Sequence, residues 1–410
     1  MKQYVIIGNG VAAAGCVEGI RSVDKVGTIT VVSQEPHAVY CRPLISYYLE
    51  GKTTLPKMLY RSDDYYEKMN CRVLLGRRAV RILKDTNEVE LDDGTLLPYT
   101  DLCLATGSKP FVPPFDGLDT VKNPHSFMTL DDALALEQSI NENSRVLIVG
   151  AGLIGLKCAE GICERVAEVT VCDLADRVLS SILDNECAAM MQAHLESRGI
   201  RFYLGDSAKR FEGNVAHMQS GEVLPFDVLV LAVGVRANTS LFRDIGGEVN
   251  RGILVDDTMQ TSIPHIYAAG DCSEGYDCSI GQKRVLAILP NAYMGGYTAG
   301  VNMTGGFKSF DNAIPMNSIG FFGLHAMTAG SYEGDLYEVK TDHSIKRLFT
   351  KDDTLKGFIL IGRDERAGIY TSLIREKTPL SSINFDLLKE AATTAAFSAD
   401  ARHKKFGGVV

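Results

Sequence analysis

The chain contains two continuous apolar runs that each end in a glycine-rich loop. The first is QYVIIG at residues 3–8, and the second is RVLIVG at residues 145–150. Runs that are apolar at almost every position are typical of strands buried on both faces, as in parallel sheets. Each loop precedes a segment suited to a helix and then another apolar run, TITVVS at 28–33 or EVTVCD at 168–173. The pattern therefore predicts the order strand, loop, helix, strand twice in one chain.

Both loops have the spacing of dinucleotide-binding loops. They read GNGVAA at residues 8–13 and GAGLIG at residues 150–155. Small residues let the backbone approach a pyrophosphate, and the N-terminus of the following helix offers unpaired N–H groups with a partial positive charge. An acid that can bind ribose hydroxyls follows each loop, at Glu35 and at Asp173. The alternative is that both loops are tight turns that bind no ligand. This alternative is disfavoured because each loop follows a strand, precedes a helix and is followed by an acid.

Two cysteines inside the second unit, Cys158 and Cys163, have the spacing of a redox disulfide. Both fall within the helix that the loop opens. Five residues further along a helix, the chain advances about 7.5 Å and rotates by about 140°. A disulfide requires its Cα atoms within about 7 Å and its Cβ atoms near 4 Å. We therefore expect these two thiols to stay unpaired.

Length, charge and cysteine usage limit the class of protein. A chain of 410 residues should form two or three domains. Its net charge of -9 argues against nucleic acid as a partner. No stretch approaches the roughly 18 apolar residues of a membrane-spanning helix, and the first residues do not resemble a signal peptide. The ten cysteines lack the spacing of a zinc site or an iron–sulfur cluster. We expect a cytoplasmic protein without membrane insertion, with reduced thiols and with no metal of its own.

Three further motifs carry a resemblance to a known family. They are LCLATGSKP at 102–110, VLVLAVGVRANTSL at 228–241 and IYAAGDC at 266–272. Together with both loops they resemble the flavoprotein oxidoreductases of the pyridine-nucleotide-disulfide-reductase superfamily, over roughly residues 1–310. The resemblance implies an α/β fold with two Rossmann-like domains, FAD on the first loop and NAD(H) on the second.

The same resemblance implies a domain order in which the NAD(H)-binding domain is inserted into a discontinuous FAD-binding domain. We expect the FAD-binding domain at 1–112 and 244–310, and the NAD(H)-binding domain at 113–243. Residues 311–410 should form a smaller α+β domain, with strands at DLYEVK, IKRLFT and KGFILIG and a helix over 385–401. In relatives this domain often mediates contacts between subunits, so the resemblance implies a homo-oligomer or a hetero-complex.

The stretch YCRPLISYYLEGK at 40–52 narrows the resemblance. Rubredoxin and ferredoxin reductases, and the flavin domain of nitrite reductases, carry Arg-Pro here. Coenzyme A disulfide reductases and NADH oxidases carry a single active cysteine nearby. Aligning on YLEG places Pro43 rather than Cys41 at the position of that cysteine. We therefore expect no redox cysteine.

The charges beside the expected flavin site depart from those of many relatives. Those relatives place a lysine after the Arg-Pro segment and a glutamate on the NAD-side helix, whereas this chain has Tyr47 and Lys157. Either the positive charge has moved to the other wall of the site, or Lys157 is a solvated helix residue. Glu160, one turn on, can pair with Lys157 or face the nicotinamide amide. Lys157, Glu160 and Tyr47 are the candidate catalytic residues.

The remaining candidates are contacts to the two cofactors. Those expected around FAD are Gly8, Gly10, Val11, Ala12, Ala13, Glu35, Arg42, Pro43, Val80, Ala105, Thr106, Gly107, Gly270 and Asp271. Those expected around NAD(H) are Gly150, Gly152, Leu153, Ile154, Gly155, Asp173, Arg177 and Gly234. The Asp173 carboxylate would repel the 2′-phosphate of NADP by up to about 4 kcal/mol at 4 Å and an effective dielectric constant near 20. Arg177 can instead accept that phosphate, and on balance we expect NAD(H).

The resemblance implies an FAD enzyme that transfers hydride between NAD(H) and FAD and exchanges single electrons with an iron–sulfur partner. That partner is a rubredoxin, a ferredoxin or an iron–sulfur subunit. In the last case the chain would be the flavin subunit of a larger complex, such as an aldehyde oxidoreductase or a nitrite reductase. The alternatives are an NADH oxidase that reduces oxygen, and a nucleotide-sensing interaction protein with vestigial redox chemistry.

Overall fold

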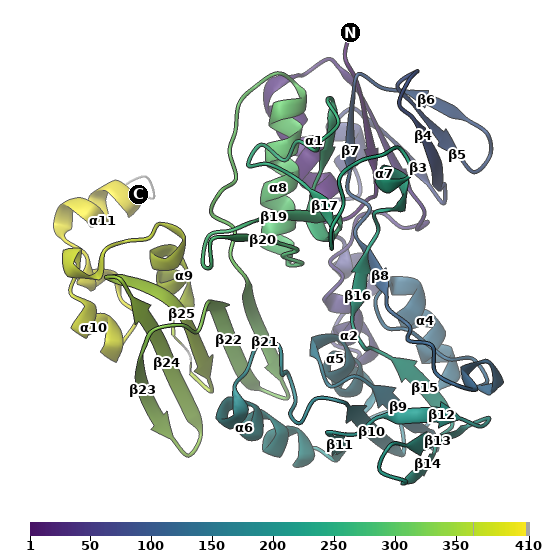
Figure 1. Ribbon diagram of the computed structural model, residues 1–410, viewed down its shortest axis with the longest axis vertical. Coiled ribbons are helices and arrows are strands. Elements are labelled where there is room, and N and C mark those ends of the chain that lie inside the picture. The colour runs from purple at the N-terminus through teal and green to yellow at the C-terminus, as the bar shows by residue number, and fades with distance from the viewer. Residues whose placement is uncertain (364, 407–410) are drawn as a thin grey trace. The chain divides into compact units, whose positions relative to one another are not determined.

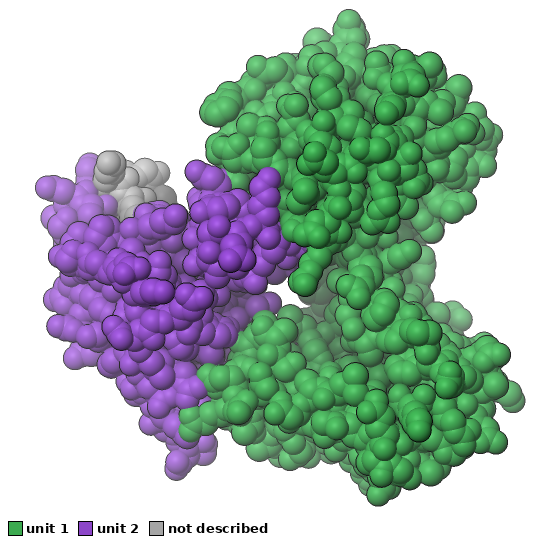
Figure 2. All heavy atoms as spheres, viewed as in Figure 1, with its two compact units in different colours: residues 1–275, 289–310 green, residues 276–288, 311–410 purple. Residues whose placement is uncertain are grey.

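The computed structural model describes residues 1–363 and 365–406, which form two compact units (Figure 1). One unit contains residues 1–275 and 289–310, and the other contains residues 276–288 and the chain from residue 311 onward (Figure 2). The hairpin at 276–288 thus belongs with the C-terminal unit. The domain boundaries expected at 112 and 243 fall inside the first unit and stay predictions.

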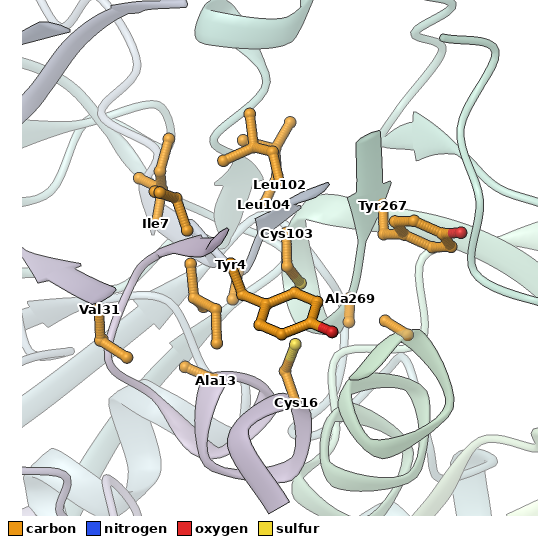
Figure 3. Close-up of a cluster of buried hydrophobic side chains, with 14 of the residues drawn as sticks. Tyr4, Ile7, Ala13, Cys16, Val31, Leu102, Cys103, Leu104, Tyr267 and Ala269 are labelled. Atoms are coloured by element: carbon orange, nitrogen blue, oxygen red, sulfur yellow. The ribbon is translucent and has the colours of Figure 1, made fainter. Parts of the chain in front are cut away.

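The first unit contains a five-stranded parallel sheet with the strand order β18-β7-β1-β2-β3. Its strands are β1 (Gln3–Ile7), β2 (Thr28–Ser33), β3 (Cys71–Leu75), β7 (Asp101–Leu104) and β18 (Ile266–Ala268). Figure 3 shows the core that this sheet forms with helix α1 (Val11–Val23), from Ile7 and Leu104 on the strands to Cys16 on the helix. The apolar runs form buried strands as their pattern predicts. Strand β18 pairs with β7 in the same sheet, although it comes much later in the sequence than the other four strands.

Helix α1 packs directly on helix α8 (Leu289–Met303), and the two lie side by side in Figure 1. A Cβ atom added to Gly19 would lie 2.2 Å from the Tyr297 carbonyl oxygen. One added to Gly300 would lie 2.2 Å from the Cys16 carbonyl oxygen. Any side chain at these positions would push the helices apart, so the glycines allow contact between the two backbones.

A second parallel sheet in the same unit has the strand order β11-β10-β9-β15. Its strands are β9 (Arg145–Val149), β10 (Glu168–Asp173), β11 (Ile200–Leu204) and β15 (Val228–Leu231), and the accompanying helices are α4 (Leu130–Ser139), α5 (Leu153–Ile162) and α6 (Asn185–Glu196). Two antiparallel three-stranded meanders form separate sheets: β4 (Ala79–Leu83), β5 (Glu88–Leu91) and β6 (Leu96–Pro98), and β12 (Ala208–Phe211), β13 (Val215–Met218) and β14 (Val223–Pro225). The two strand–loop–helix–strand units predicted from the sequence therefore form two separate sheets.

The chain crosses between the two sheets in a pair of short antiparallel strands, β8 (Ser108–Pro110) and β16 (Val235–Ala237). Thr106 and Asn238 tie the two crossings together. The Thr106 hydroxyl donates to the Asn238 carbonyl at 2.7 Å, and the Asn238 amide donates to the Thr106 carbonyl at 2.9 Å. The smaller elements of the first unit are α2 (Leu44–Leu49), α3 (Tyr65–Lys68), α7 (Ser240–Arg243) and β17 (Ile253–Leu254). Strand β19 (Ser273–Asp277) begins in the first unit and continues into the hairpin, whose second strand β20 (Gln282–Arg284) belongs to the second unit.

The second unit is built on a five-stranded antiparallel sheet with the order β21-β22-β25-β24-β23. Its elements are β21 (Met316–Phe321), β22 (Leu324–Gly330), β23 (Asp335–Thr341), β24 (Ser344–Lys351), β25 (Thr354–Ile361), α9 (Ala367–Arg375), α10 (Phe385–Glu390) and α11 (Ala399–Phe406). The three strands expected from the sequence are β23, β24 and β25. Among the described residues, no helix is long and apolar enough to cross a membrane.

The continuous helix expected over 385–401 was wrong. Helix α10 ends at Glu390, and Thr393 adopts an extended backbone with ψ at 144°. Its hydroxyl accepts a hydrogen bond from the Ala395 N–H at 3.2 Å. A threonine side chain that bonds nearby backbone competes with helical hydrogen bonds, which explains the break.

Candidate functional site

The first glycine loop combines a close backbone contact with an open space. Gly8 has a φ of 112°, and a Cβ atom there would lie 2.0 Å from the Ala105 carbonyl oxygen. Only glycine fits this approach of β1 to the end of β7. Gly10 is the N-cap of α1, and a Cβ atom there would point into open space. The loop is therefore packed on one side and accessible on the other.

The accessible side presents the unpaired N–H groups of a helix N-terminus. The first hydrogen bond of α1 runs from the Ala14 N–H to the Gly10 carbonyl at 3.1 Å. The N–H groups of Val11, Ala12 and Ala13 precede that bond, and their side chains are small and apolar. Such an end binds an anion through the N–H groups and the helix dipole. The arrangement suits a diphosphate.

The second loop repeats this geometry. Gly150 has a φ of 120°, and its Cβ atom would lie 2.3 Å from the Ala232 carbonyl oxygen. Gly152 caps α5 and borders open space. The two loops differ at their last position, which is Ala13 in the first loop and Gly155 in the second. Alanine does not fit at Gly155, because a Cβ atom there would lie 1.9 Å from the Gly150 carbonyl oxygen.

In this second loop, the first hydrogen bond of α5 runs from the Leu156 N–H to the Gly152 carbonyl. The N–H groups of Leu153, Ile154 and Gly155 precede that bond, so they are available to bind an anion, as are the N–H groups at the start of α1. The residues of both loops fit the diphosphate of a dinucleotide.

Glu35 and Arg42 meet beside the first loop. The Glu35 carboxylate accepts a hydrogen bond from the Tyr40 hydroxyl at 2.7 Å and forms an ion pair with Arg42. The Arg42 guanidinium also donates to the Met128 carbonyl at 3.2 Å. Burial disfavours the charge of Arg42, but the fields of Tyr40, Glu35 and Asp271 outweigh it and raise the pKa. Arg42 thus stays a cation close to two expected FAD contacts.

Asp271 is oriented by a residue that the sequence interpretation did not single out. The Ser108 hydroxyl donates a hydrogen bond to its Oδ2 at 2.9 Å. The signal was present, because Ser108 lies inside the motif at 102–110. Gly107 and Gly270 have φ values of 64° and 79°, so both turns use left-handed backbone. The structure therefore links the expected ribityl contact to the crossing strand β8.

Pro43, Val80 and Gly234 lie on three different elements. Pro43 is the N-cap of α2. Val80 is the extra residue of a β-bulge in β4, with 39% of its surface exposed. Gly234 has a φ of 112° beside open space, and its carbonyl accepts from the Phe111 N–H at 2.9 Å. Their roles as cofactor contacts stay predictions.

Asp173 is fixed against the second loop by two backbone groups. Its Oδ2 accepts from the Ala151 N–H at 2.7 Å, and its Oδ1 accepts from the Ala175 N–H at 2.8 Å. Arg177, four residues on, pairs with Asp176 at 2.8 Å and donates to the Leu183 carbonyl at 3.3 Å. The Asp173 carboxylate is thus held at the loop, whereas the Arg177 guanidinium bonds to residues close to it in the chain.

The structure brings the three candidate catalytic residues together. The Lys157 ammonium lies 4.8 Å from the centre of the Tyr47 ring and forms an ion pair with Glu160. The exposed fractions of the Lys157 and Glu160 side chains are only 15% and 4%. Lys157 is therefore not a solvated surface residue. Helices α2 and α5 touch here, since a Cβ atom on Gly161 would lie 3.1 Å from the Ser46 carbonyl oxygen.

Comparison with known proteins identifies the family to which this geometry belongs. Residues 2–296 match the pyridine nucleotide-disulphide oxidoreductase family. The chain belongs to this family. Over 395 residues it is 33% identical to subunit epsilon of the NADH-dependent phenylglyoxylate dehydrogenase of Aromatoleum evansii, covering 93% of each chain. It is also 33% identical to the NADH oxidase of Methanocaldococcus jannaschii, covering 74% of this chain and 70% of the oxidase.

Solved structures agree with this assignment. The reductase in the covalent putidaredoxin reductase–putidaredoxin complex superposes with a TM-score of 0.87 and 25% identity, covering 95% of each chain. The protein is accordingly an NAD(P)H-dependent oxidoreductase of this family, with FAD and NAD(H) as its cofactors.

The cysteines of this family member are in the thiol form. None of the ten, each within the described part of the chain, forms a disulfide. Cys158 and Cys163 lie in and at the end of α5 and do not pair, as the helix geometry predicts. Burial raises the pKa of the Cys41 thiol above its usual value, and burial with nearby carboxylates raises the pKa of Cys163 to about 11. A thiol becomes a good nucleophile when its pKa falls, so neither residue is activated.

Proposed function

We propose that the protein transfers hydride between NAD(H) on the second loop and FAD on the first, and exchanges single electrons between FAD and an iron–sulfur partner. The observation that carries the proposal is the pair of open helix N-termini within one compact unit, with the Tyr47–Lys157 contact beside the second. Bound FAD takes up two electrons as hydride and can release them one at a time. The thiol nearest the Arg-Pro segment, Cys41, is not activated, so the proposed route needs no sulfur.

The residues of the first loop have separate tasks in this proposal. The N–H groups at the start of α1 bind the FAD diphosphate, and Glu35 accepts from the adenosine ribose. Asp271, oriented by Ser108, binds the ribityl chain. Arg42 supplies positive charge next to Glu35. These contacts hold the flavin without any group that must gain or lose a proton.

The residues of the second loop hold the nicotinamide coenzyme. The N–H groups at the start of α5 bind its diphosphate, and Asp173 accepts from the ribose hydroxyls. Lys157 supplies a buried positive charge one turn into α5, where charge moves between the two cofactors. Tyr47 and Glu160 hold its ammonium in place. A preorganised charge of this kind stabilises a transition state without reorganisation.

The relatives support a protein partner for electron transfer in two forms, a separate carrier or a fixed subunit. One similar solved structure is a reductase in covalent complex with putidaredoxin. The phenylglyoxylate dehydrogenase relative is one subunit of a larger NADH-dependent enzyme, and it matches this chain along nearly its whole length. We favour the second form, a fixed subunit, because the net charge of -9 would repel a free acidic carrier.

An affinity-tagged chain purified from its native host tests the partner. We expect an iron–sulfur protein to co-purify and to be reduced when NADH is added without air. Rubredoxin and a [2Fe–2S] ferredoxin, tested as free acceptors, distinguish a mobile carrier from a fixed subunit. If NADH-reduced protein passes its electrons only to oxygen, the chain is an NADH oxidase and the iron–sulfur proposal is wrong.

A further inference from the structure

Glu137 on helix α4 joins two segments next to the Tyr47–Lys157 contact. Its Oε2 accepts a hydrogen bond from the Tyr48 hydroxyl at 3.0 Å, and its Oε1 accepts from the Arg165 guanidinium at 3.0 Å. Arg165 follows α5 in the chain, whereas Tyr48 lies in α2. One carboxylate therefore connects three elements, which lie close together in Figure 1.

Arg165 makes a second contact that closes this group. The same guanidinium nitrogen donates to the Leu49 carbonyl at 3.0 Å, at the C-terminal end of α2. A cation is favourable at this end of a helix, where carbonyl groups lack helical partners. Helix α2 is thus held at its end by Arg165 and on its side by Glu137.

A helix of six residues needs such support. Helices this short are not stable by themselves, so tertiary contacts determine where α2 lies. Tyr47 and Tyr48 are neighbours on it, and successive residues of an α-helix are rotated by about 100°. Tyr48 points to Glu137 and Tyr47 to Lys157. Fixing the Tyr48 hydroxyl therefore fixes the rotation of α2, and with it the position of the Tyr47 ring.

The protonation state of Tyr48 suits this task. Burial, and then the hydrogen bond to Glu137, raise the pKa of Tyr48 above its ordinary value. The phenol consequently stays a donor to the carboxylate throughout the neutral range. Glu137 and Arg165 are about one third exposed, so their contribution is to geometry more than to stability.

We propose that Glu137 is a positioning residue for hydride transfer, which acts by holding α2 so that Tyr47 covers the Lys157 ammonium. The proposal rests on the function proposed above, in which Lys157 lies beside the reacting cofactors. In this proposal Glu137 acts through Tyr48 and Arg165 rather than by touching a cofactor. Its effect should therefore disappear when Lys157 is absent.

Two substitutions test this directly. Glu137→Gln keeps the size of the side chain but replaces one acceptor oxygen with an NH₂ group, so either Tyr48 or Arg165 loses its acceptor. Tyr48→Phe removes one hydroxyl and is the second variant in case the first does not fold. Glu142→Gln removes the same charge from an exposed position shortly after α4 and is the matched control.

The measurements are the limiting rate of flavin reduction by NADH without air, and the midpoint potential of the bound flavin. We expect Glu137→Gln to lower the limiting rate about tenfold, because a small displacement of positioned groups has effects of this size. Tyr48→Phe should lower it less, and Glu142→Gln should leave it unchanged. The midpoint potential should become more negative in Glu137→Gln, because a displaced Tyr47 no longer covers the Lys157 ammonium and water screens its positive charge, although the ion pair with Glu160 remains.

A double-mutant cycle separates this role from a merely structural one. In a Lys157→Met background, Glu137→Gln should change neither the rate nor the potential further. Equal effects of Glu137→Gln in both backgrounds, or no effect in the wild-type background, would overturn the proposal. Failure of NADH to reduce the wild-type flavin at all would instead refute the proposed function, and the Glu137 proposal with it.

Discussion

Replacing Asp173 with asparagine should shift the coenzyme preference from NADH toward NADPH. The two backbone N–H groups of Ala151 and Ala175 hold the carboxylate at the second loop, so its charge cannot move away from a bound coenzyme. Asparagine has the same size and no charge. It therefore removes the repulsion toward a 2′-phosphate while keeping most of the local packing.

The expected size of the shift follows from Coulomb's law. Two unit charges 4 Å apart at an effective dielectric constant of 20 repel by about 4 kcal/mol. Asp173 is partly exposed, and salt screens part of that interaction. Half of the full value, about 2 kcal/mol, corresponds to a change of about thirtyfold in the ratio of the two kcat/KM values. One N–H group would face the new NH₂ group, at a cost in folding stability of about 1 kcal/mol.

The assay is steady-state kcat/KM for NADH and for NADPH, with a dye as electron acceptor. Glu222→Gln, which neutralises an exposed carboxylate in the same part of the chain, is the matched control. We expect its NADH/NADPH ratio to equal that of the wild type. An unchanged ratio in Asp173→Asn, or an equal shift in both variants, would refute the assignment of Asp173 as the ribose-binding acid.

Three further predictions concern the flavin side and the packing beneath it. Lys157→Met should lower the rate of flavin reduction by NADH about tenfold or more, because it removes a buried charge at the site; an unchanged rate in stopped-flow would exclude Lys157 from it. Ser108→Ala should weaken FAD binding by the apoprotein about fivefold, since Asp271 loses one hydrogen bond of about 1 kcal/mol. Fluorescence titration measures this affinity, and the role of Ser108 fails if Ser108→Ala binds FAD as tightly as Ser108→Thr, the control that keeps the hydroxyl. Gly300→Ala should lower the free energy of unfolding by about 1–3 kcal/mol, because the new methyl group overlaps the backbone of α1. Denaturant titration of this variant would contradict the packing argument if its midpoint matched that of the wild type.

The sequence predicted what depends on local pattern. Continuous apolar runs gave the strands β1, β2, β9 and β10, and glycine spacing gave the two loops. Gly8 and Gly150 must be glycine for a reason that the sequence implies only indirectly, because a side chain there would overlap the carbonyl groups of Ala105 and Ala232, which follow distant strands. Helix geometry was also enough to predict that Cys158 and Cys163 do not pair, because that prediction depends on a single helix.

What the sequence could not give are contacts between residues far apart in the chain. Nothing local to Tyr48 indicates that its partner is Glu137, and the motif at 102–110 marks Ser108 as a candidate without indicating that its partner is Asp271. The burial of Lys157 likewise depends on α2 packing over it. The prediction of one continuous helix over 385–401 failed because of a local contact. The apolar pattern there is typical of a helix, but it does not indicate that the Thr393 side chain bonds to nearby backbone.

The central claim is that electrons pass between NADH and FAD without a sulfur relay. An anaerobic titration of the purified protein with NADH, followed by flavin absorbance, tests it most directly. We predict that one equivalent of NADH per FAD bleaches the flavin fully, and that Cys41→Ser behaves identically, because the flavin alone stores the two electrons. A requirement for two equivalents, or loss of bleaching in Cys41→Ser, would show that a cysteine pair or a cysteine adduct takes part and would contradict the account.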